Sequence, residues 1–178
     1  MFQTAAGVTV PFPEQIKEQY RLDEDSLTLN LSFEKLADFI RAFYAVLDEP
    51  LFLAVHPDAE AHEVWYLDGM TPAQLSMLLD GYGELLYQDG LSSFAIGSLT
   101  TSEEIFVQKY KVISVYSPDI ERFLPLLSRF GVARTNALTT VWDTFSPEHP
   151  GVAQRLVVDD MTIPDMIREM QKIGMYKG

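Results

Sequence analysis

The segment from residue 71 to residue 116 decides the fold. It reads TPAQLSMLLDGYGELLYQDG (71–90), LSSFAIGSL (91–99) and then EEIFVQKYKVISVY (103–116). Thr71 and Gln74 have the spacing of a capping box, and Pro72 suits the first helical position because its missing N–H needs no partner there. Leucines recur with helical spacing until Asp89-Gly90, a pair typical of turns. The segment therefore predicts a helix followed by two strands.

The same helix–strand–strand pattern recurs on both sides of this segment. Helix starts are expected near residues 33, 72, 118 and 164, and Pro125 should kink or split the third helix at Leu124. The strand pairs expected outside the central segment are 51–55 with 63–67, and 137–145 with 153–159. The run 103–116 is long for one strand, so we expect a bulge or bend within it.

These patterns predict an α+β fold, a two-layer sandwich with a mainly antiparallel sheet of about six to eight strands and four helices on one face. Residues 1–178 are assigned to a single domain, in which residues 1–31 form an N-terminal arm or strand region. Residues 32–178 comprise three helix–strand–strand units and a C-terminal helix. The predicted core positions are Leu36, Ile40, Phe43, Leu53, Val55, Leu75, Leu78, Leu79, Phe94, Ile96, Phe106, Leu124, Leu127 and Ile167.

Composition excludes several classes of protein. The 178 residues are 47% hydrophobic and include no cysteine, which rules out disulfides, thiolate metal sites and cysteine nucleophiles. No stretch is long and apolar enough to span a bilayer, and the N-terminus lacks the features of a signal peptide. We therefore expect a cytoplasmic protein that is not inserted in a membrane.

The net charge of −13 is concentrated in one part of the chain. Between Arg41 and Lys109 there are eleven acidic residues and no lysine or arginine, whereas both ends of the chain are nearly balanced. Such a field repels nucleic acid and favours encounter with a basic protein. Greater solubility is the simpler consequence of the same charge.

Protein binding is the function that we expect first, with a basic protein as the partner. Trp65 and Tyr66 are the candidate apolar anchors, and Glu60, Glu63 and Asp68 are the candidate acidic rim around them. In size and charge the chain resembles small acidic bacterial immunity and inhibitor proteins. It would then be non-catalytic, without a cofactor, and the sequence leaves its oligomeric state open.

Two alternatives remain open from the sequence. His56, Asp58, Glu60 and His62 lie in one short loop, and such residues suit zinc, nickel or iron in a metal-dependent hydrolase, although their spacing matches no established metal motif. A small-molecule binding domain would instead need a deep apolar pocket. Its expected lining is a tyrosine such as Tyr66, Tyr82 or Tyr110.

Overall fold

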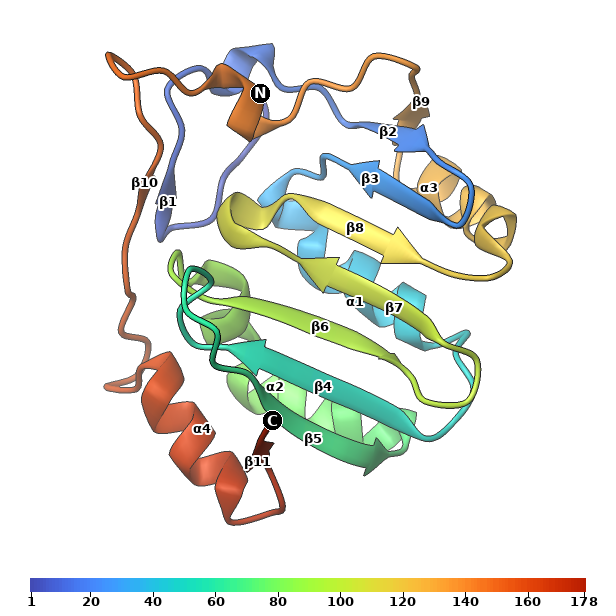
Figure 1. Cartoon of the computed structure of the whole chain (residues 1–178), viewed down its shortest axis with the longest axis vertical. Helices are drawn as coiled ribbons and strands as arrows, with labels where there is room; N and C mark the ends of the chain where they lie inside the picture. Colours follow the sequence, from blue (N-terminus) through green and yellow to red (C-terminus); the bar gives the residue numbers. More distant parts are fainter.

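The computed structural model describes the whole chain, residues 1–178, and its centre is a nine-stranded sheet (Figure 1). In spatial order the strands are β11 (Tyr176–Lys177), β5 (Trp65–Met70), β4 (Leu51–His56), β6 (Ser93–Ser98), β7 (Glu103–Val107), β8 (Ile113–Tyr116), β3 (Ser26–Leu29), β2 (Gln19–Leu22) and β9 (Ala133–Arg134). All neighbours pair antiparallel except β2 and β9, which are parallel. A separate two-stranded sheet joins β1 (Val8–Thr9) to β10 (Val152–Ala153).

Four α-helices accompany the sheet. They are α1 (Leu36–Tyr44), α2 (Pro72–Gln88), α3 (Leu124–Arg129) and α4 (Ile163–Gln171). Helices α1 and α2 lie behind the sheet in Figure 1, α4 lies at its β5 side, and the front of the sheet carries no helix. The α+β class and the mainly antiparallel sheet are confirmed. The two-layer sandwich and the recurring units are not.

The helix boundaries follow the local signals in the sequence. The capping box at the start of α2 is formed, because Gln74 donates its N–H to the Thr71 hydroxyl and its side chain accepts from the Thr71 N–H. The expected split at Leu124 is also present. A 3-10 helix (Ile120–Phe123) ends there and α3 begins, since Pro125 is tolerated only in a first helical turn.

The core lies between the sheet and its helices. Every second residue of each central strand points to that side, and Leu53, Phe94 and Ile105 are completely buried. Of the predicted core positions, Leu79 and Leu124 are only half-buried and pack against the edge of this cluster.

The run 103–116 does not form one bent strand, as the sequence pattern suggested. The chain reverses at Lys109–Lys111, so β7 and β8 are an antiparallel hairpin. Tyr110 and Lys111 both have φ near +60°, a conformation that residues other than glycine rarely adopt, so no turn signal marks this reversal. Side-chain alternation along β7 places Ile105 and Val107 in the core, so Phe106, which was predicted in the core, points to the opposite side of the sheet.

Lys111 holds this unusual turn against the C-terminal end of α2. Its ammonium group donates to the backbone carbonyl oxygens of Leu86 (3.3 Å) and Asp89 (2.6 Å). These carbonyls lack helical partners, and a cation near them is favoured by the helix dipole. Burial lowers the pKa of Lys111 to about 8, while the Asp89 carboxylate acts in the other direction.

The third predicted strand pair is not formed. Residues 137–145 contain only a 3-10 helix (Val141–Thr144), and of the region predicted as the second strand only the start lies in β10, which pairs with β1. The edges of the main sheet are instead formed by β9 and β11, and β10 pairs with the N-terminal strand β1. The segment that contains β10 runs along the side of the molecule to α4 (Figure 1).

A buried carboxylate, Asp89, ties that segment to the rest of the fold. Asp89 is fully buried and accepts hydrogen bonds from the N–H groups of Ser92 and Leu156, both at 2.9 Å. Its ion pair with the Arg155 guanidinium is also 2.9 Å long. One side chain therefore joins the α2–β6 turn to the chain that leads to α4.

We predict that Asp89→Asn lowers the free energy of unfolding by about 2–3 kcal/mol, because it leaves the partly buried Arg155 without a counter-ion. Urea denaturation at neutral pH measures this. Asp48→Asn is the control: Asp48 is exposed, and its substitution should cost less than ~0.5 kcal/mol. Equal effects of the two changes would contradict the proposed role of Asp89.

Candidate functional site

The side of the sheet that faces away from α1 and α2 is uncovered, and we call it the open face. The strand register aligns its side chains in rows. One row contains Tyr176, Tyr66, Ala54, Ala95, Phe106, Ser114, Thr28 and Arg21. The adjacent row contains Phe52, Gly97, Glu104, Tyr116 and Ser26. Aromatic rings, separated by small residues, therefore dominate the middle of this face.

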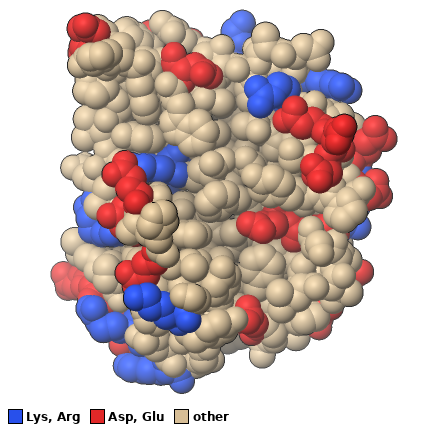
Figure 2. Space-filling model, viewed as in Figure 1, with Lys and Arg blue, Asp and Glu red and all other residues tan.

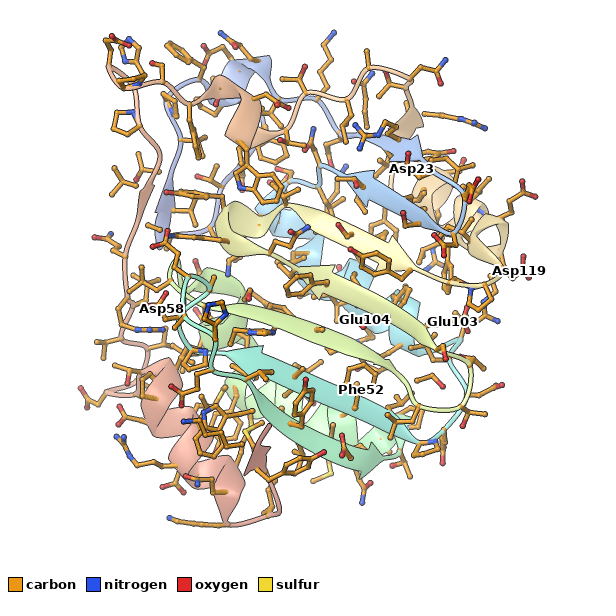
Figure 3. All side chains as sticks on the ribbon, viewed as in Figure 1. Asp23, Phe52, Asp58, Glu103, Glu104 and Asp119 are labelled. Carbon is orange, nitrogen blue, oxygen red and sulfur yellow. The ribbon has the colours of Figure 1, made fainter.

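Gly97 sets the geometry of the second row. A Cβ at this position would come within 2.7 Å of the Phe52 ring and 2.3 Å of the Glu103 carbonyl oxygen. The ring of Phe52 therefore lies over Gly97, the residue that is aligned with Glu104 on the neighbouring strand. Figure 3 shows Phe52 and Glu104 near each other on the open face.

Glu104 is a half-buried carboxylate with no partner inside the molecule. Burial raises the pKa of Glu104 above its ordinary value, and neither an ion pair nor a hydrogen bond opposes this shift. Strands β3 to β8 contain no lysine or arginine. Figure 2 likewise shows no basic group in the middle of the open face, although acidic groups lie within and around it.

The preceding residue, Glu103, has the opposite environment. It points toward the helices, is 4% exposed, and accepts hydrogen bonds from the Ser117 hydroxyl (2.7 Å) and the Arg122 guanidinium (2.8 Å). Because side chains alternate along β7, the Glu103 carboxylate is buried with hydrogen-bond partners, whereas the Glu104 carboxylate lies on the open face without a counter-ion.

We predict opposite effects of Glu104→Gln and Glu103→Gln on stability. The pKa of Glu104 is higher in the folded protein than in the unfolded chain, where it is near 4.5. The wild-type protein therefore loses part of its free energy of unfolding as the pH rises from 4.5 through the folded pKa. Glu104→Gln removes this loss. It should stabilise the protein at pH 7 by a small amount, under ~0.5 kcal/mol because water screens the group, and should match wild type at pH 4.

Glu103→Gln should instead lower the free energy of unfolding at pH 7 by about 2 kcal/mol, because Arg122 loses its buried partner. Urea denaturation at pH 4 and pH 7 measures both variants. If Glu104→Gln destabilises the protein as Glu103→Gln does, Glu104 has a stabilising partner and the assignment above is wrong.

The structure divides the five residues predicted to bind a partner. Tyr66 and Asp68 lie on the open face, where Tyr66 contacts Tyr176 (ring centroids 5.8 Å apart). The Tyr176 hydroxyl donates to Asp68 (2.5 Å), and this hydrogen bond raises the pKa of Tyr176. Trp65, the other proposed anchor, points to the opposite side of β5 and packs against the core.

The two remaining acids already have partners. The Glu63 carboxylate accepts from the Trp65 indole N–H (2.6 Å) and lies 3.9 Å from the Lys177 ammonium. Glu60 is exposed on the loop between β4 and β5 and is paired with Lys109 (2.5 Å). The predicted rim is therefore not a ring of free carboxylates around one aromatic pair.

The acidic segment 42–108 does not place its charges on one surface. Asp89 and Glu103 are buried and paired, and Asp80 and Glu84 lie exposed on α2, behind the sheet. Glu104 is the carboxylate at the centre of the open face. The negative field around that face is thus set by a few surrounding acids and by the lack of lysine and arginine in strands β3 to β8.

The histidine-containing loop has no preformed metal ligand set. His56 ends β4 and faces Phe106 (ring centroids 5.9 Å apart), and burial lowers its pKa. Asp58 accepts from the backbone N–H of Glu60, and His62 is exposed. Nowhere does the structure bring three His, Cys, Asp or Glu side chains together in a metal-binding arrangement.

The three tyrosines considered for a small-molecule site lie in different places. Tyr66 is on the open face, Tyr82 lines an open hollow of about 520 Å³ beside Met77 and Ile173, and Tyr110 lines a hollow of about 10 Å³. The structure does not combine them in one deep pocket.

Comparisons with protein-family models, curated proteins and solved structures found no significant match. None of the helices has the length and apolar character needed to cross a membrane. Function is therefore inferred from the geometry of the open face. Phe52, Glu104 and Tyr116, which the sequence did not single out, are its central residues.

Proposed function

We propose that the chain is a non-catalytic, cytoplasmic protein-binding module that binds a basic protein on the open face, as an inhibitor or immunity-type protein would. The observation that carries this proposal is the unpaired Glu104 carboxylate among exposed and half-buried aromatic rings, on a face that no other element covers.

The charge distribution supports a basic partner. The chain carries a net charge of −13, and six adjacent strands of the open face have no lysine or arginine. A basic protein would be steered to this face over about one Debye length, ~10 Å at 0.1 M salt. Like charge would repel nucleic acid and acidic proteins from the same face.

The aromatic residues support binding by a protein surface. Tyr116 is 43% exposed and Tyr176 is 48% exposed, and Phe52, Tyr66 and Phe106 are half-buried on the same side of the sheet. Aromatic side chains bring large contact areas at a small entropic cost and are enriched among residues that dominate interface energies. Of the residues expected from the sequence, Tyr66 and Asp68 belong to this proposed interface, and Glu60 lies on the neighbouring loop.

Affinity capture from the source cell tests this proposal. We expect the immobilised protein to retain a basic protein at ~50 mM salt and to lose most of it at ~500 mM salt, because screening shortens the steering field. The double change Asp68→Lys with Glu104→Lys should reduce retention at least ~10-fold, since like charge then opposes the partner.

The matched control is Asp80→Lys with Glu84→Lys, which makes the same change in net charge on α2, behind the sheet. This variant should retain the partner nearly as well as wild type. Equal losses for the two variants would indicate unspecific charge attraction, and retention that ignores both would contradict the proposed interface.

A further inference from the structure

We infer that Glu104, flanked by Phe52 and Tyr116, is the anchor site for one arginine side chain of the partner. This inference rests on the proposed function and specifies the group that the open face recognises. It follows from the row geometry, from the partners of the other acids, and from the difference between guanidinium and ammonium groups.

The row geometry places Glu104 between two aromatic rings. In the strand register, Glu104 is aligned with Tyr116 on β8 and with Gly97 on β6, and Gly97 is aligned with Phe52 on β4. Neighbouring strands are about 4.8 Å apart, so the aromatic residues originate about 5 Å and 10 Å from Glu104 on its two sides. Because Gly97 has no side chain, the Phe52 ring fills the intervening space. The carboxylate therefore has an aromatic wall on each side and solvent above it.

Glu104 differs from three other acids near the open face, each of which already has a partner. Asp68 accepts a hydrogen bond from Tyr176, Glu60 is paired with Lys109, and Asp23 is paired with Arg21 at 3.7 Å. A basic group that approached Glu60 or Asp23 would compete with a cation already in place, and at Asp68 it would share the carboxylate with the Tyr176 hydroxyl. At Glu104 it would instead satisfy a carboxylate that burial has already stripped of part of its water.

Arginine fits this arrangement better than lysine. Its planar guanidinium donates two parallel hydrogen bonds to a carboxylate and stacks on aromatic rings, and it is more weakly hydrated than an ammonium group. Flanking rings add cation–π attraction, which strengthens when the site is desolvated. The Glu104 carboxylate and its flanking aromatic rings should therefore bind the planar guanidinium of arginine more tightly than the ammonium group of lysine.

The test uses two defined probes, octa-arginine and octa-lysine peptides, titrated into the folded protein at ~50 mM salt. We expect octa-arginine to bind at least ~5-fold more tightly than octa-lysine. NMR should show changes at the Glu104 side-chain carboxyl carbon and at the ring protons of Phe52 and Tyr116. Glu104→Gln should weaken octa-arginine binding about 10-fold and remove the preference for arginine.

Glu84→Gln is the control, because it removes the same charge from an exposed position on α2 and should change affinity less than ~2-fold. Circular dichroism verifies that both variants are folded. If octa-arginine binds wild type and Glu104→Gln equally and remains salt-sensitive, the anchor assignment is overturned but a basic partner is still supported. If neither peptide binds wild type, both the anchor and the proposed function are overturned.

Discussion

The structure depends on the burial of one face of an antiparallel sheet against the helices that pack on it. Successive strand residues point to opposite faces, so packing Leu53 and Phe94 into the core at 0% exposure commits Ala54 and Ala95 to the other side. No second layer covers that side (Figure 1). The same alternation that builds the core thus creates a broad, weakly polar surface, with Glu104 at its centre.

Much of the fold was predictable because its signals are local. Helix caps, the effect of Pro125 and the apolar periodicity specify four helices and an antiparallel sheet. The hairpin between β7 and β8 was not predictable, since Tyr110 and Lys111 adopt left-handed conformations without a glycine, and the turn is held by contacts of Lys111 with α2. The third strand pair was also wrongly predicted, because β10 pairs with β1, a contact between segments far apart in the chain that local patterns do not reveal.

The candidate site was predictable only in part. Tyr66 and Asp68 lie on the open face as residues of an interface would, but Trp65 is adjacent to Tyr66 in a strand and so faces the core. Glu103 and Glu104 are identical in type and adjacent in sequence, and only the strand register reveals which one is buried and paired. Net charge along the sequence gave no such information, because hydrogen bonding and burial decide which carboxylates are free.

Carboxylate footprinting of the captured complex tests the central claim most directly. The protein is labelled with carbodiimide and glycine ethyl ester, alone and with its partner bound, and the modified residues are quantified by mass spectrometry. The account predicts that partner binding protects Glu104 and Asp68 and leaves Asp80 and Glu84 on α2 as reactive as before. Protection confined to Asp80 and Glu84, or unchanged labelling of Glu104, would contradict it.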